Sequence, residues 1–311
     1  MLTGLAALEN TDWSRLSHAY GRATDTPGHL RALLHEDAAA RKAAMSHLWS
    51  AVIHQGTPWT ATGPAALVVA GLLADERIDR GEPIRANLLS FLVRVAEAPE
   101  QVGSSGRAAR GCLKAAPILM KVMLEELKNA NPRVRACAAA GATRLAKIEP
   151  LRQHAQELEL QLLALARSAN DSDERSAHVL ALGELGVSPF AFLDDPSPAV
   201  RMCAALAPGL SDNLTALYEL LMALEHHAGD IDDWFAAKPL QFDMRPRFAA
   251  VARLLRQIKD FGKLVDAAIA VVRITEEFCV DFEWGPLLAA AFSDGSGAIK
   301  TTRNADSLPH S

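Results

Sequence analysis

The chain has 311 residues, a formal net charge of −5 and an isoelectric point near 6.1, which argue against a dedicated nucleic-acid binder. Half of its residues are hydrophobic but only 5% are aromatic, a balance that favours Ala/Leu-rich helices over a β-sandwich. The N-terminus lacks a basic leader with an apolar run, and no stretch of about 18 apolar residues occurs. We therefore expect a cytoplasmic protein without a signal peptide and without contact to a membrane.

Two stretches of the sequence are near-copies of one another. NPRVRACAAAGATRL occupies residues 131–145 and PAVRMCAAL occupies residues 198–206, so both contain Val-Arg-x-Cys-Ala-Ala. In each, small residues recur at helical spacing and a proline stands in the first turn, where its missing N–H costs little. Asn131 and Ser197 are the expected N-caps. Such a stripe of small residues lets a neighbouring helix approach closely.

An arginine follows a helix-capping residue by four positions at several places. The pairs are Asp37 and Arg41, Asn131 and Arg135, Asp171 and Arg175, Ser197 and Arg201, and Asp243 and Arg247, with Arg85 as a further candidate. This D-x-x-x-R opening before an Ala-rich helix resembles the HEAT repeat, most of all in DSDERSAHVLALGELG at 171–186. The resemblance covers sections of residues 35–255. It implies that the arginines are structural and tie successive repeats together.

The N-terminal segments WSRLSHAYG and HQGTPWTAT resemble the leading part of certain bacterial HEAT-like proteins of unassigned activity. Together these resemblances imply an all-α HEAT-like α–α superhelix, a solenoid of antiparallel helical hairpins. We expect it to form one domain over residues 1–293, with a candidate joint at 99–106 and a flexible tail at 294–311. Helices should then contact near neighbours only, and most contacts should join residues fewer than about 100 apart.

The helices are predicted in chain order from their proline, glycine and capping signals. The expected segments are 12–20, 27–34, 37–54, 64–74, 83–96, 107–128, 132–146, 151–168, 172–185, 198–207, 212–227, 246–259, 261–275 and a last helix from Pro286. Pro117 should kink or divide the helix at 107–128. Trp13 and Trp49 are predicted to be core residues.

The cysteines and histidines give little sign of chemistry. No CxxC pair is present, and we interpret Cys137 and Cys203 as buried thiols rather than as a disulfide or a metal pair. His178 replaces an alanine of the sister repeats, so we expect a buried, hydrogen-bonded histidine, with a proton-transfer group as the alternative. His226 and His227 are adjacent and would point apart on a helix, without HExxH-type spacing. We therefore expect no metal and no cofactor.

Polar and aromatic residues cluster at 54–60, 230–235 and 276–284 in an otherwise monotonous Ala/Leu sequence. Aromatic side chains in polar turns are frequent anchors of interfaces, and neighbouring carboxylates would attract a basic partner. The alternative for 54–60 is that Trp59 packs into the helical stack. The alternative for 230–235 is a solvated loop, and for 276–284 it is an end cap of the last repeat. The predicted binding residues are His54, Gln55, Trp59, Asp232, Asp233 and Trp234.

No GxSxG, P-loop or GxGxxG motif identifies catalytic residues. The concave wall of a solenoid suits a non-enzymatic protein that holds a macromolecular partner, of inhibitor or immunity type. A protein is the favoured partner, with nucleic acid or a small molecule as alternatives. The competing hypothesis is an enzyme with its site in the concave groove, as in HEAT-like alkylpurine DNA glycosylases and bilin lyases. A glycosylase would require Trp59, Trp234 and Asp233 to converge beside a basic track.

Overall fold

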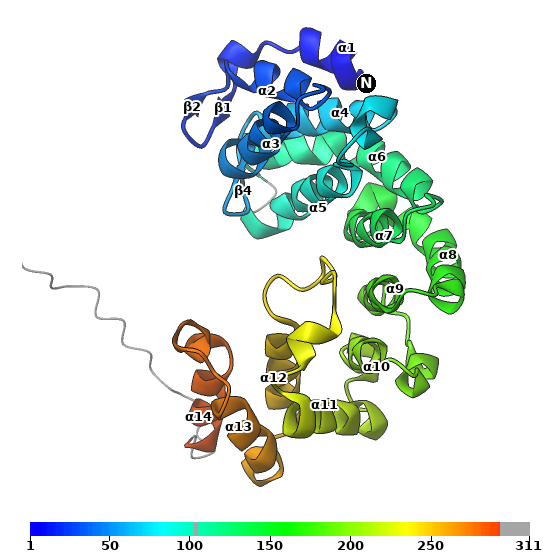
Figure 1. Cartoon of the computed structure of the whole chain (residues 1–311), viewed down its shortest axis with the longest axis vertical. Coiled ribbons are helices and arrows are strands. Elements are labelled where there is room, and N and C mark those ends of the chain that lie inside the picture. Colours follow the sequence, from blue (N-terminus) through cyan, green and yellow to red (C-terminus); the bar gives the residue numbers. More distant parts are fainter. Residues whose placement is uncertain (103–104, 293–311) are drawn as a thin grey trace, which may run out of the picture.

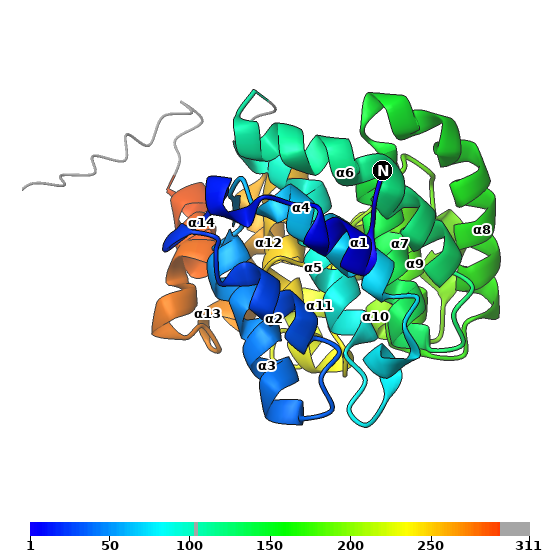
Figure 2. The ribbon, with the colours of Figure 1, turned by 90° about the horizontal axis from the view of Figure 1, so that it is seen from above.

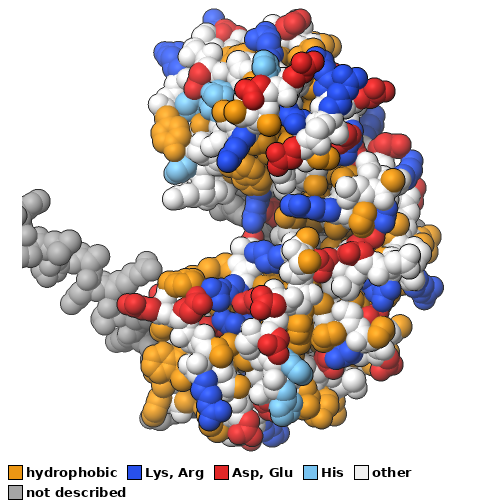
Figure 3. Space-filling view, viewed as in Figure 1, with side chains coloured by type: hydrophobic (Ala, Val, Ile, Leu, Met, Phe, Trp, Pro, Cys, Tyr) orange, Lys and Arg blue, Asp and Glu red, His pale blue; other side chains and the backbone are white. Residues whose placement is uncertain are grey.

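The computed structural model describes residues 1–102 and 105–292, without the side chains of 100–102. Within these ranges the chain is nearly all helical, with only two short hairpins of β structure, so the all-α prediction is confirmed. The helices follow one another along an arc (Figure 1), and a space-filling view shows that the arc surrounds a hollow that is open on one side (Figure 3). No helix in the described ranges is both long and apolar enough to cross a membrane. Part of the candidate joint at 99–106 and the whole predicted tail lie outside the described residues.

Along most of the arc the helices form an outer and an inner row. The outer helices are α4 (Thr62–Leu72), α6 (Arg107–Glu126), α8 (Ala155–Ser168), α11 (Leu214–His227) and α13 (Val265–Val272). The inner helices, which face the hollow, are α5 (Arg85–Val102), α7 (Pro132–Ala146), α9 (Ser172–Glu184), α10 (Pro198–Ala205) and α12 (Pro246–Gln257). The chain ends its described part with α14 (Trp284–Ala291), packed on α12 and α13. Pro117 does not divide α6.

The N-terminal region is irregular. α1 (Gly4–Glu9) lies against α4, as Figure 2 shows, and α2 (Thr26–Ala32) packs on α3 (Ala38–His47). The helix predicted at 12–20 is wrong, because only Trp13–Arg15 forms a 3₁₀ turn and β1 (Ser17–His18) then pairs with β2 (Gly21–Arg22). The reversal depends on Gly21, whose φ of 131° is accessible to glycine.

A second hairpin follows α3. The helix expected to reach residue 54 changes into a π-helix at Leu48–Val52, and β3 (Ile53–His54) then pairs with β4 (Thr57–Pro58). Gln55 and Gly56 turn the chain with φ values of 50° and 79°, as a two-residue hairpin loop requires. Trp13 is buried as predicted, whereas Trp49 is 38% exposed and its core assignment is wrong.

Arginines tie the N-termini of the inner helices to the turns before them and to the next helix. Arg135 donates to the carbonyl oxygens of Asn129 and Ala130 at 2.7 and 2.8 Å, and its Nε and Nη2 donate to the Glu174 carboxylate at 2.5 and 2.8 Å. Bonds of the same kind join Arg175 to Ala169 and Asp195, Arg201 to Asp195, Pro196 and Glu219, and Arg247 to Ala228 and Glu283. These bonds confirm the structural role predicted for the arginines.

Four of the five predicted capping residues are N-caps in the structure. Asp37, Asn131 and Asp171 are N-caps whose side chains accept backbone N–H bonds, and Ser197 is an N-cap without such a bond. Asp243 does not cap α12, because that helix begins at Pro246, and its carboxylate is used elsewhere.

A second set of ion pairs joins the C-terminal parts of the inner helices. Glu97 of α5 accepts from Arg94 at 2.8 Å and from Arg144 of α7 at 2.9 Å, while Arg144 also donates to Glu184 of α9 at 2.6 Å. Each inner helix from α5 to α9 is therefore held near both of its ends by charge-assisted hydrogen bonds, which are stronger than neutral ones.

Small residues set how closely the helices approach. α4 crosses α6 so tightly that a Cβ on Gly63 would overlap the backbone of Gly111. Cys137 and Cys203 are buried, unpaired thiols, as predicted. They therefore act as small apolar side chains at the contacts of α7 and α10.

We predict that Arg135→Met destabilises the protein by about 3 kcal/mol, because it leaves the Glu174 carboxylate, which is 3% exposed, without its cation. Urea denaturation followed by circular dichroism measures the loss. The matched control is Arg133→Met, two residues earlier in α7, where the exposed side chain should change stability by less than about 0.5 kcal/mol. Equal losses in the two variants would show that the tie to Glu174 contributes nothing specific.

Gly63→Ala is expected to destabilise the protein by about 3 kcal/mol or more, since the added methyl group must push α4 away from α6. Gly28→Ala is the control, because a Cβ on that helical glycine would meet nothing within 4 Å. Alanine there should be neutral or stabilising by up to about 1 kcal/mol. Thermal unfolding distinguishes the two, and a tolerated Gly63→Ala would contradict the close crossing.

Candidate functional site

The segment 235–245, here called the crossing segment, extends from the C-terminal half of the arc into the hollow (Figure 1). Three bonds hold it to the inner row. Asp173 accepts from the Ala237 N–H at 2.6 Å, Gln241 donates to the Ala177 carbonyl at 3.0 Å, and Arg94 donates to Asp243 at 2.8 Å. The last bond joins residues 149 positions apart, so the expectation of near-neighbour contacts alone is wrong at this segment.

The crossing segment keeps its shape through its own side chains. Phe235 and Phe242 are buried and meet edge to face with their ring centroids 5.7 Å apart. Lys238 donates to the Met244 carbonyl at 2.8 Å. The crossing segment is therefore an ordered bridge, with an aromatic pair as its anchor.

Cavities lie on both sides of the crossing segment. A cavity of about 330 Å³ separates it from the N-termini of α7 and α9, with Ser90, Arg133, Cys137, Asp173 and Lys238 among its lining residues. A wider hollow of about 550 Å³ separates it from α12 and the turn at Glu277–Phe282, with Asp233, Lys238, Arg245, Phe248 and Phe278 among its lining residues. Figure 3 shows acidic and basic side chains gathered along the C-terminal side of the hollow inside the arc of helices.

Two of the three sequence clusters, 230–235 and 276–284, meet at this wider hollow. Arg245 links them, because it lies 3.8 Å from the Asp232 carboxylate, donates to Glu276 at 2.7 Å and lies over the Phe278 ring at 5.3 Å from its centroid. Phe278 is 71% exposed and its neighbour Phe282 is 44% exposed. We call the surface formed by Asp233, Met244, Arg245, Phe278 and Phe282 the C-terminal wall.

The predicted residues in 230–235 differ in their surroundings. Asp233 is exposed, whereas Asp232 is half-buried and lies 3.3 Å from Arg247, so part of its charge stabilises the fold. Trp234 is half-buried against the core, with its ring 5.9 Å from that of His227. The exposed aromatic groups at this hollow belong instead to the third cluster, 276–284, and are Phe278 and Phe282.

The other predicted residues, His54, Gln55 and Trp59, lie in and beside the β3–β4 hairpin, across the hollow from Ile231–Trp234 (Figure 1). Trp59 is half-buried and its Nε1 is enclosed without a hydrogen-bond partner in the described structure. His54 Nδ1 donates to the Ser50 carbonyl at 2.9 Å, and its ring meets that of Tyr20 edge to face. The structure thus does not bring together the tryptophans and the carboxylate that a glycosylase-like site would need.

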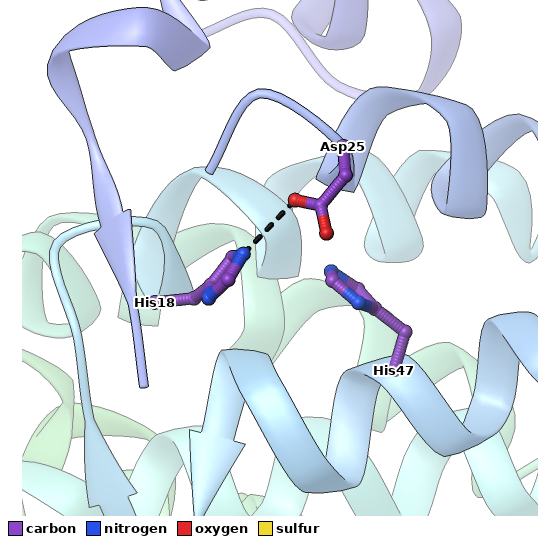
Figure 4. Close-up of side chains that lie close together, drawn as sticks. All are labelled: His18, Asp25 and His47. Carbon is purple, nitrogen blue, oxygen red and sulfur yellow. Dashed lines mark hydrogen bonds and ion pairs between the residues drawn. The ribbon is translucent and has the colours of Figure 1, made fainter. Parts of the chain in front are cut away.

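A histidine-rich cluster near this hairpin was not predicted. His18, Asp25 and His47 converge from β1, from the turn before α2 and from the last residue of α3 (Figure 4). His18 and Asp25 are hydrogen-bonded at 2.9 Å, and His47 is bonded to Thr26 at 3.0 Å. Burial, helped by the neighbouring His29, lowers the pKa of His47 to about 4.

His178 is fully buried, as predicted, but its ring is not well hydrogen-bonded. Both ring nitrogens lack a hydrogen-bond partner in the described residues, and the nearest carboxylate, Glu174, lies 3.5 Å away and is already bound by Arg135. Burial and the positive charge of Arg135 lower the pKa of His178 to about 4. The ring is therefore neutral at pH 7 and packs as a core side chain, which does not suit a proton-transfer role.

Comparisons of the chain with protein-family models, with curated proteins and with solved structures found no match.

We predict that lowering the pH reduces the free energy of unfolding of the wild type more than that of the His178→Leu variant. A histidine whose pKa is about 4 in the folded protein, against an ordinary pKa of 6.5 in the unfolded chain, binds fewer protons folded than unfolded, so stability falls as pH drops through this window. Between pH 7 and pH 5 this group alone should remove about 2 kcal/mol. Urea midpoints at both pH values measure the difference, and an equal acid response of the two proteins would contradict the prediction.

Proposed function

We propose that this protein is a HEAT-like solenoid that binds a protein partner in its hollow, against the C-terminal wall. The ordered stack of paired helices and the arginine ties at the helix N-termini support the HEAT-like architecture. One observation carries the binding proposal: exposed Met244 and Phe278 line a hollow of about 550 Å³, and exposed Phe282 stacks on Phe248, which lines the same hollow. Apolar side chains that gather on a surface with a polar rim mark interaction sites.

The rim of this wall indicates which kind of partner binds. Asp233, Glu276, Glu277 and Asp281 are exposed carboxylates beside the exposed aromatic rings. A partner segment with basic residues flanking an apolar side chain would complement this surface. A protein that holds such a segment blocks the partner's own surface, which fits an inhibitor or immunity role.

Nucleic acid fits the inner wall less well. Its arginines Arg94, Arg135 and Arg144 are engaged with carboxylates at 2.5–2.9 Å, so their charge is largely neutralised for a phosphate backbone. The carboxylates on the C-terminal wall would in addition repel phosphates. A protein partner is therefore the better proposal.

Site-specific cross-linking tests the proposal. A photo-reactive amino acid at position 278 should capture one discrete protein from the native lysate, and excess unlabelled wild type should suppress the product. The same group at Leu160, which is 65% exposed on the outer helix α8, is the matched control and should give no such product. Equal products from both positions, or a product at 278 that nuclease removes, would overturn the proposal.

With the captured partner in hand, Phe278→Ala should weaken binding at least about tenfold without changing helical content, because the ring is exposed and can act as an anchor. Neutralising Asp233 and Glu277 should slow association mainly at low salt. Surface plasmon resonance at two salt concentrations measures both effects. Unchanged affinity of the Phe278→Ala variant would show that this wall is not part of the binding site.

A further inference from the structure

We propose that His18, Asp25 and His47 form a binding site for one divalent cation of the zinc class. One ligand atom from each of the three side chains lies within 4.8 Å of the other two. Figure 4 shows the carboxylate of Asp25 above the two imidazole rings, with all three groups pointing toward a common centre. The site lies across the hollow from the C-terminal wall, so it is independent of the proposed partner surface.

Rigid backbone elements hold the three residues in place. The Ala19 N–H donates to the Ala51 carbonyl at 3.0 Å, which fixes the β1–β2 hairpin to the end of the helix that carries His47. That helix continues from His47 into the π-helix Leu48–Val52, and single π turns inside helices are frequent at functional sites. Thr26, at the start of α2, lies with its Oγ1 3.0 Å from Nε2 of His47 and so sets the orientation of the ring without the cation; a cation on that nitrogen replaces this bond.

The ligand set has the composition of a zinc site with an open position. Two imidazole nitrogens and a carboxylate oxygen, with a water as fourth ligand, are typical of tetrahedral zinc centres. Bonds of about 2.1 Å place neighbouring tetrahedral ligand atoms about 3.4 Å apart. Small side-chain rotations would bring the present atoms, which are all within 4.8 Å, to that spacing.

Burial divides the site into a closed side and an open side. The side chains of His18 and Asp25 are 6% and 54% exposed, and His47 is buried as well. The imidazoles therefore form a dry floor, while the carboxylate faces solvent, where an ion can enter with a bound water.

Both hydrogen bonds of the His18 ring must change when the cation binds. The Tyr20 N–H donates to Nδ1 of His18 at 3.1 Å, so the ring proton of the neutral histidine sits on Nε2 and is donated to Asp25. A cation on Nε2 replaces that proton, and the ring then carries its proton on Nδ1. The Tyr20 N–H must turn away, which its place at the hairpin tip, with the side chain 69% exposed, allows.

The full chain without a histidine tag, titrated with Zn²⁺ alone, tests the site. We expect one zinc per chain after desalting, and a higher melting temperature with zinc, because the ion binds only the folded state. Asp25→Asn and His47→Gln should each weaken zinc binding at least about tenfold and abolish the thermal shift. Asp25→Asn is the safer variant for folding, because its side chain is largely exposed.

The control replaces His226 and His227, two exposed histidines in α11, by glutamine and should bind zinc like the wild type. Hydrogen exchange gives a second readout, because the Tyr20 amide should exchange faster in the zinc-loaded protein. The proposal is overturned if zinc is not retained, if Asp25→Asn and His47→Gln keep wild-type affinity, or if only the His226/His227 control loses the ion. Each of these results would identify the cluster as a hydrogen-bonded structural element or the zinc as adventitious.

Discussion

The contact on which the inner row depends is the bond of an arginine in the first turn of one helix to a carboxylate of the next. Arg135 shows why arginine is needed: its planar guanidinium reaches two carbonyls of the preceding turn and both oxygens of Glu174 at once. A lysine could not satisfy this fork. The helices that these bonds join present alanine, glycine and cysteine to each other, so each contact buries little apolar area per residue. The directional bonds between charged groups thus fix how neighbouring inner helices are aligned, which the packing of small side chains alone would specify only loosely.

These ion pairs between the inner helices neutralise most of the charge of the inner wall. Arg144 bonds both Glu97 and Glu184 at one end of the inner helices, and Arg135 bonds Glu174 at the other. Recognition is therefore expected where the repeat pattern is broken, since side chains there are not committed to the stack. The break at 228–245 supplies the crossing segment, and the irregular turn at Glu277–Phe282 supplies exposed rings.

The two breaks of the pattern differ in chemistry. The C-terminal wall combines exposed aromatic groups with carboxylates. The rings can bury apolar side chains of a macromolecular partner, and the carboxylates can pair with its positive charges. The N-terminal cluster is small, largely buried and formed by His18, Asp25 and His47. The β1–β2 hairpin replaces the helix that capping and glycine signals predict for 12–20, and without it His18 could not face Asp25. Irregular structure is thus the origin of both candidate sites, as is common where a scaffold carries function.

The regular part of this protein follows from local sequence. Proline and capping signals placed α7, α9 and α10 closely, and the spacing of Arg135, Arg175 and Arg201 after their caps indicated their structural role, because these are local properties of one helical turn. Composition also singled out 230–235 and 276–284, but it could not show that they meet. That meeting, the bond between Arg94 and Asp243, and the approach of His18, Asp25 and His47 arise only in the folded chain. The physical reason is that such contacts depend on how the whole arc curves and where its hairpins turn, and no local spacing encodes the distance between residues so far apart along the chain.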